Sequence, residues 1–123
     1  MHKKMTERQI EKLAYEIRNF LLRKKLWMDV TIYFNGKAIS TDDRDGHYAY
    51  NDPAKLFVLE NQDPKRYCEY AGGVLTMTFE GDFYEVMNYG YRPKVLEEFW
   101  DLLGKYGLHY ELGHAWSLSV YPN

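Results

Sequence analysis

"MDVTIYFNGKAIST", residues 28–41, is the stretch that decides the fold, because apolar and polar residues alternate on both sides of a central Asn35-Gly36. Asn-Gly is the strongest short signal for a β-hairpin, since both positions of a type I′ turn need positive φ. Folding the chain there places Ile32 opposite Ile39, with the apolar side chains of both strands on one face. The stretch therefore predicts two antiparallel strands joined by a two-residue turn.

The rest of the chain contains patterns for helices and further strands. Thr6 and Gln9 have the spacing of a capping box, and apolar residues then recur at helical intervals as far as Leu21. Residues 54–60 and 65–71 fit either a strand or a short helix. The expected elements are a helix over 6–25, strands over 27–34, 37–42, 47–50 and 74–80, a helix over 83–89 capped by Asp82, a helix that opens at Pro93 and is capped by Gly107, and strands over 108–112 and 114–121.

This order of elements indicates the fold class. It runs α-β-β-β…β-α-β-β and lacks the regular alternation of strands and helices that builds parallel sheets. We therefore expect an α+β fold with a mainly antiparallel sheet and two long helices. A chain of 123 residues can bury one core but not two, so we expect residues 1–123 to form a single domain.

Charge is distributed unevenly along the chain. Residues 1–26 contain eight Lys/Arg and three Glu, whereas residues 27–123 contain eight Lys/Arg and fifteen Asp/Glu. The basic residues at the end of the first helix, Arg23, Lys24 and Lys25, suit the helix dipole and form a candidate contact for nucleic acid. The alternative, which we favour, is a solvated helix face whose charge opposes that of an acidic body.

Several classes of protein are disfavoured by composition. No apolar run approaches the roughly 20 residues that span a membrane, and the first seven residues lack the apolar segment of a secretory signal. Cys68 is the only cysteine, so no disulfide can form within the chain. We therefore expect a cytoplasmic protein without a membrane partner.

The acidic stretch "TDDRDGHYAYND", residues 41–52, has the residue order of a calcium loop only in part. With Gly46 at position 6 of an EF-hand loop, Asp43, Asp45 and Asp52 fall at the ligand positions 3, 5 and 12. Position 1 lacks a carboxylate, position 12 has Asp where the longer Glu is usual, and the flanking segments have strand patterns. A polar turn is the favoured interpretation, with a weak cation site at these aspartates as the alternative.

A second group of metal-ligand residues lies near the end of the chain. His109 and Glu111 point the same way on a strand, and a turn at Gly113 could bring His114 near them. Two imidazoles and a carboxylate suit zinc or iron. The spacing H-x-E-x-x-H matches no established metal motif, however, and polar pairs on the solvent face of a hairpin are common.

The chain shows no complete catalytic constellation. A phosphate-binding loop, a dinucleotide fingerprint and a nucleophile elbow are all missing from the sequence. Cys68 would need a base and an orienting group to act as a nucleophile, and no histidine is fixed beside it by spacing. We therefore expect no enzymatic activity and no cofactor.

Aromatic residues are concentrated in the last third of the chain. Tyr combines a large apolar ring with a polar tip and is enriched in protein interfaces. These rings fit either the core or an interface. The candidate interface residues are Tyr89, Tyr91, Tyr110, Trp116 and Tyr121.

Three stretches carry a resemblance to other proteins: "IYFNGK" (32–37), "LTMTFEGDFYEVMNYG" (75–90) and "YGLHYELGHAWSLSVY" (106–121). They resemble small proteins carried on mobile elements and prophages of Gram-positive gut bacteria. The resemblance spans most of the chain and implies an accessory role, against host defence or in regulation of the element. It implies no particular functional residues.

These patterns lead to one main hypothesis and two alternatives. The main hypothesis is a small intracellular interaction or regulatory module that binds another protein or itself. The first alternative is a metal-binding protein or metal-dependent enzyme that uses His109, Glu111 and His114. The second is nucleic-acid binding through the basic first helix, although the aromatic-rich part of the chain is acidic and disfavours it.

Overall fold

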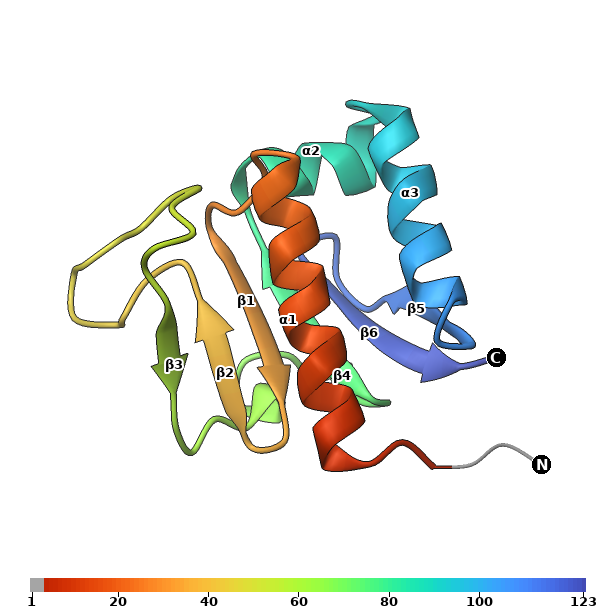
Figure 1. Cartoon of the computed structure of the whole chain (residues 1–123), viewed down its shortest axis with the longest axis horizontal. Coiled ribbons are helices and arrows are strands. Elements are labelled where there is room, and N and C mark those ends of the chain that lie inside the picture. Colours follow the sequence, from red (N-terminus) through yellow and green to blue (C-terminus); the bar gives the residue numbers. More distant parts are fainter. Residues whose placement is uncertain (1–3) are drawn as a thin grey trace.

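The computed structural model describes residues 4–123, which form helices and one antiparallel sheet (Figure 1). The α+β prediction is confirmed. In chain order, the elements are α1 (Glu7–Arg23), β1 (Val30–Phe34), β2 (Lys37–Ser40), β3 (Phe57–Leu59), the short 3-10 helix η1 (Pro64–Arg66), β4 (Leu75–Phe79), α2 (Gly81–Tyr89), α3 (Pro93–Gly104), β5 (Leu108–Leu112) and β6 (Ser117–Pro122).

The sheet has six strands in the order β3-β2-β1-β4-β6-β5, and every neighbouring pair is antiparallel. The predicted hairpin register is confirmed, with Ile32 opposite Ile39 and Phe34 opposite Lys37. Asn35 and Gly36 both have positive φ, as the two-residue turn requires. On its other side β1 pairs with β4, which is followed by β6 and β5, and β2 pairs with β3, so the hairpin lies within the sheet.

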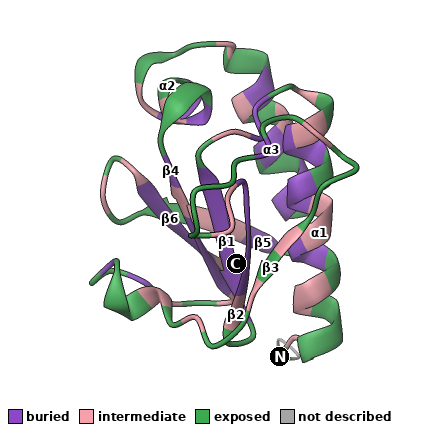
Figure 2. Cartoon of the chain, turned by 90° about the vertical axis from the view of Figure 1, so that its left-hand side faces the viewer, coloured by how far each residue is buried: buried purple, intermediate pink, exposed green. Residues whose placement is uncertain are grey.

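One face of the sheet is apolar and is covered by helices. Figure 2 shows α1 and α3 together on one side of the sheet. The capping box of α1 forms as predicted, with Thr6 Oγ1 accepting from the amide of Gln9 and Gln9 Oε1 accepting from the amide of Thr6. The buried apolar cluster takes Ile17 from α1, Phe99 from α3 and Met77 from the centre of the sheet.

The opposite face of the sheet is lined by hydroxyl groups. The Oγ atoms of Thr76 and Ser119 lie 2.8 Å apart, and those of Thr31 and Ser40 lie 2.9 Å apart. All four side chains are buried. The segment after η1 covers part of this face, because the amide of Gly72 donates to Ser119 Oγ at 3.2 Å.

The predicted strand over 47–50 is wrong. Tyr48 makes only an isolated bridge with Asp42, and the backbone turns at Arg44 and Gly46, where φ is +69° and +89°. The polar side chains of this stretch bind nearby backbone amides, which competes with a regular strand ladder.

The structure resolves the two ambiguous segments, 54–60 and 65–71, and corrects two predicted helix caps. Residues 57–59 form the edge strand β3, and Asp63 Oδ1 caps η1 by accepting from the amide of Lys65. Asp82 is not the cap of α2, because the helix begins earlier, at Gly81, where φ is +64°. Gly107 is not the cap of α3, which ends at Gly104.

None of the helices of residues 4–123 is both long and apolar enough to cross a bilayer.

Candidate functional site

A polar hollow of about 260 Å³ opens between the 42–50 loop and the end of β4. Its lining includes three carboxylates, from Asp29, Asp42 and Glu80, and two aromatic rings, from Tyr48 and Trp116. These residues come from four segments that are distant in sequence. The hollow is therefore a product of sheet topology.

A second hollow of about 420 Å³ adjoins the first. The two share Glu80 and Trp116, and the second adds the carboxylates of Asp82 and Glu85 and the ring of Tyr84. Here we call the two hollows together the acidic groove. Among residues 4–123, five carboxylates line it against a single cationic side chain, that of Arg44.

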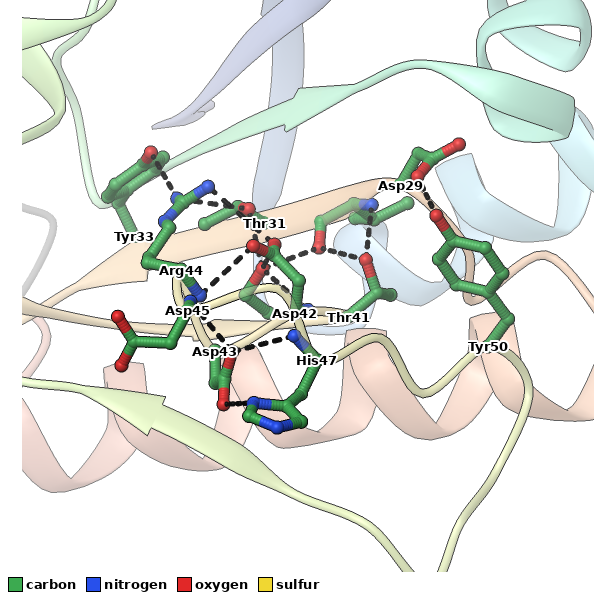
Figure 3. Close-up of polar contacts among 12 residues, drawn as sticks. Asp29, Thr31, Tyr33, Thr41, Asp42, Asp43, Arg44, Asp45, His47 and Tyr50 are labelled. Atoms are coloured by element: carbon green, nitrogen blue, oxygen red, sulfur yellow. Dashed lines mark hydrogen bonds and ion pairs between the residues drawn. The ribbon is translucent and has the colours of Figure 1, made fainter.

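The guanidinium of Arg44 contacts side chains of its own loop and of β1 (Figure 3). Its Nη2 donates to the hydroxyl of Tyr33 at 3.2 Å, and its Nη1 lies 3.6 Å from Asp42 Oδ1. The backbone amide of Arg44 also donates to Asp42 Oδ2 at 3.1 Å. Burial raises the pKa of Tyr33, so its hydroxyl stays protonated beside the guanidinium.

Asp29 ties the loop to the other wall of the groove. The Tyr50 hydroxyl donates to Asp29 Oδ1 at 2.5 Å, and this hydrogen bond raises the pKa of Tyr50 to about 12. The backbone oxygen of Asp29 accepts from the amide of Glu80 at 2.9 Å. The second contact places Asp29, just before β1, beside Glu80, just after β4.

Asp29 and Arg44 also have positive φ, which is uncommon for arginine and more frequent for aspartate. Their φ values are +55° and +69°. Non-glycine residues with positive φ gather at sites where the surrounding structure holds them in place. Both residues line the groove, so the chain accepts local strain at this position.

Aromatic rings line the groove beside the carboxylates. Tyr48 is 62% exposed, with its ring centroid 5.8 Å from that of Tyr50. Trp116 stacks on His114, with ring centroids 4.4 Å apart and planes 8° apart. His114 in turn packs against Tyr70. Trp116 thus lines both hollows, and its ring packs on His114, which packs on Tyr70.

The structure brings His109 and Glu111 together but leaves His114 elsewhere. His109 Nε2 lies 3.0 Å from Glu111 Oε2, and His109 Nδ1 lies 2.9 Å from Asn123 Oδ1. The contact with Glu111, then that with Asn123, raises the pKa of His109. Both ring nitrogens are engaged, and among residues 4–123 no group of three His, Cys, Asp or Glu side chains is placed to hold a metal ion.

The aspartates of the 41–52 stretch make contacts with different partners. Asp43 Oδ2 lies 2.6 Å from His47 Nδ1, whereas Asp52 Oδ1 accepts from the amide of Ala54. Asp45 points away from Asp43 in Figure 3. Desolvation opposes the ionised form of Asp43, but hydrogen bonds from the amides of Asp45 and His47 and from the His47 ring hold its pKa below the usual value. The three predicted ligands therefore do not converge.

The five candidate interface aromatics divide among several positions. Tyr89 and Tyr91, around the α2–α3 connection, are exposed. Tyr110 packs on Trp100 at a centroid distance of 4.4 Å, and Tyr121 covers Gly72 and Gly73. Trp116, as described above, lies in the acidic groove.

Some of the basic residues in and just after α1 already contact groups within the chain. Lys24 Nζ lies 2.6 Å from Glu98 Oε2, while Arg23 and Lys25 are exposed. Arg18 is buried, and its Nη2 donates to the backbone oxygen of Lys55 at 3.0 Å. Burial lowers the pKa of Arg18, which nevertheless stays far above neutral pH.

Cys68 is buried beneath the polar face. Its thiol donates to Ser117 Oγ at 3.3 Å. The thiol therefore contacts a hydroxyl group and not the imidazole that a nucleophilic cysteine would need as a base. Cys68 is a buried packing residue in this structure.

Most groove residues were not identified from sequence. Of its main lining groups, only Trp116 was predicted as an interface residue, and Asp42 lay in a stretch that was considered for its other aspartates. The one usable signal was Glu80, which shares the polar face of the 74–80 strand with Thr76 and Thr78. No protein family, curated protein or solved structure with which the chain was compared matches it.

Proposed function

We propose that this chain is a protein-interaction module whose acidic groove binds a Lys/Arg-rich segment of a partner protein. The observation that carries the proposal is the gathering of five carboxylates and three aromatic rings around two adjoining hollows that share Glu80 and Trp116. An extended basic segment could place one cationic side chain in each hollow.

The chemistry of the groove suits ammonium and guanidinium groups. Opposite charges across an interface attract a partner and fix its register. Aromatic faces add to this attraction, at about 0.5–1 kcal/mol for an exposed cation–π contact. Arg44 neutralises one lining carboxylate, that of Asp42, so the other four carry the attraction for an incoming cation.

The same charges disfavour phosphate-bearing partners at this site. A nucleic acid would bring further negative charge to a groove with an excess of four carboxylates over cations. Nucleic acid would have to use exposed cations outside the groove, which in and around α1 include Arg8, Lys12, Arg23 and Lys25. None of these residues lines either hollow, so we favour a basic protein segment as the ligand of the groove.

The proposal also includes the cellular compartment and the kind of partner. The single cysteine fits a cytoplasmic protein. An accessory protein of a mobile element would act by engaging a host or element-encoded protein, and a basic segment is a common feature of proteins that handle nucleic acid. The chain would then recognise such a partner without contacting the nucleic acid.

A direct test uses a fluorescein-labelled octapeptide of alternating Lys and Arg, followed by fluorescence anisotropy. We expect binding that weakens steeply as salt rises, because exposed charges are screened. The double variant Glu80→Lys with Glu85→Lys should bind at least about tenfold more weakly, since two favourable charge contacts become unfavourable. Glu80 precedes α2 but makes no side-chain capping bond, so its replacement removes no cap from this helix.

The matched control is Glu60→Lys with Glu97→Lys, which changes net charge by the same amount at two exposed positions outside the groove. It should bind within about threefold of the wild type, since distant exposed charges are largely screened. An equal loss in both double variants would mean that the peptide responds only to net charge and would refute the groove as the site. No binding at low salt would refute the proposal outright.

A further inference from the structure

The strand β5 forms one edge of the sheet, and its backbone groups alternate between partnered and outward-facing. Gly107 O accepts from the amide of Asn123, and the amide of Gly113 donates to Ser117 O. In an antiparallel ladder the groups directed toward one neighbour alternate with those directed away. The odd-numbered residues from 107 to 113 therefore face β6, and Leu108, Tyr110 and Leu112 direct their amide and carbonyl groups to the open edge.

The register of β6 supports this assignment. Leu108 lies opposite Pro122, which has no amide to donate. Tyr110 lies opposite Val120, and the oxygen of Val120 accepts from Val74 on the β4 side. No hydrogen bond from another residue of the described chain, residues 4–123, reaches the outward groups of β5.

The sequence of β5 is self-complementary about its centre. It reads Leu-His-Tyr-Glu-Leu, from Leu108 to Leu112. If a second β5 runs antiparallel with the two Tyr110 residues opposite each other, each leucine meets a leucine and each His109 meets a Glu111. Cross-strand pairs of opposite charge and of apolar residues both stabilise antiparallel sheets.

The surroundings of this edge also fit a second copy. Leu112 is 44% exposed, and Trp100, which packs on Tyr110, is 41% exposed. Edge strands are usually protected by proline, lysine or a bulge, and β5 contains neither proline nor lysine. The other edge strand, β3, is only three residues long, which limits the pairing it could support.

We infer that two copies of the chain associate through β5, in antiparallel register about a two-fold axis at Tyr110, so that their sheets become continuous. Such an interface is isologous, and each copy contributes the same surface. Its hydrogen-bonded pairs would be Tyr110 with Tyr110 and Leu108 with Leu112 of the other copy. Each His109 would lie opposite a Glu111 in the intervening positions.

Sedimentation velocity over micromolar to millimolar concentrations tests the inference. We expect a reversible monomer–dimer equilibrium in the wild-type chain. Leu112→Pro removes an amide that faces outward and is not used by β6, so the chain should stay folded by circular dichroism. Its dimer dissociation constant should rise at least about tenfold.

A charge-complementation experiment separates pairing between copies from effects within one strand. Glu111→Lys gives a strand with only His and Lys at these positions, and His109→Glu gives one with only Glu. Each variant alone should dimerise at least about tenfold more weakly than the wild type, and their equimolar mixture should recover the dimer. A wild type that stays monomeric throughout, or a dimer insensitive to Leu112→Pro and to mixing, would overturn the inference.

Discussion

Thr31 and Ile32 are neighbours in β1, yet they are buried in opposite ways. Ile32 lies in the apolar cluster beneath α1 and α3, whereas Thr31 joins Ser40 through a hydroxyl pair on the other face. The same alternation recurs in β4, where Met77 lies in the cluster and Thr76 pairs with Ser119. One sheet thus has an apolar face closed by helices and a polar face closed by loops.

The difference indicates a division of roles between the two faces. Apolar burial supplies most of the free energy of folding and is indifferent to direction. Hydrogen bonds contribute less net free energy but fix positions, because an unpaired buried group is costly. The acidic groove belongs to the polar side, where Arg44 binds Tyr33 and Asp42 binds Ser40.

The largest expected effect is on the apolar face. Phe99 is fully buried and packs edge-on against Phe83, with centroids 5.6 Å apart. Phe99→Ala should lower the free energy of unfolding by about 3–5 kcal/mol, through lost burial and the cavity left behind. Urea denaturation measures this change. A loss below about 1 kcal/mol would contradict the assignment of the helix-covered face as the main source of stability.

A smaller loss is expected on the polar face. Ser119→Ala removes the shorter contacts of Thr76 Oγ1 and of the Gly72 amide, which keep longer contacts with each other's residue at 3.4 Å. The free energy of unfolding should fall by about 0.5–1.5 kcal/mol, the net contribution of a typical hydrogen bond. Urea denaturation of this variant, of Thr76→Val and of the double variant completes a mutant cycle. Strict additivity would show that the two hydroxyls do not act as a pair.

The contact between Tyr50 and Asp29 should matter more for the groove than for stability. Tyr50→Phe removes one hydrogen bond of a partly exposed side chain and should cost less than about 1 kcal/mol. Asp29 would lose its tie to the loop, so the affinity for the Lys/Arg octapeptide should fall. Unchanged affinity would show that this tie does not position the groove.

The smallest expected effect is a pH dependence at the exposed His109–Glu111 pair. The pKa of His109 is raised in the folded chain, so its stabilising contribution is present below the unfolded pKa of about 6.5 and is lost as pH rises through the folded pKa. Glu111→Gln should therefore reduce stability more at acidic than at alkaline pH. NMR titration should also show a lower His109 pKa in the variant. An unchanged pKa would mean that Glu111 does not contact the ring in solution.

The sequence predicted those parts of the fold that local chemistry determines. Asn35-Gly36 set the hairpin and its register, and Thr6 with Gln9 set the start of α1. The conformation of the 41–52 loop could not be predicted in the same way, because Arg44 adopts a positive φ that is unusual for arginine. There the side chains bind the backbone of their own loop in place of a neighbouring strand.

The groove could not be predicted from local patterns. Asp29, Asp42 and Glu80 lie near the ends of three different strands, and only the sheet order brings them together. His109 and Glu111 contact each other because they lie two residues apart on one strand, whereas His114, beyond the turn, does not join them. Convergence of distant side chains requires the topology, which the strand patterns alone leave open.

The most direct test of the acidic groove is an NMR titration of the ¹⁵N-labelled chain with the unlabelled Lys/Arg octapeptide. We predict that the largest shift changes fall on the backbone amides of Asp42, Glu80 and Glu85 and on the indole N–H of Trp116. The amides of β5, away from the groove, should move little. Changes spread evenly over the acidic surface, or centred away from Glu80 and Trp116, would contradict the proposed site.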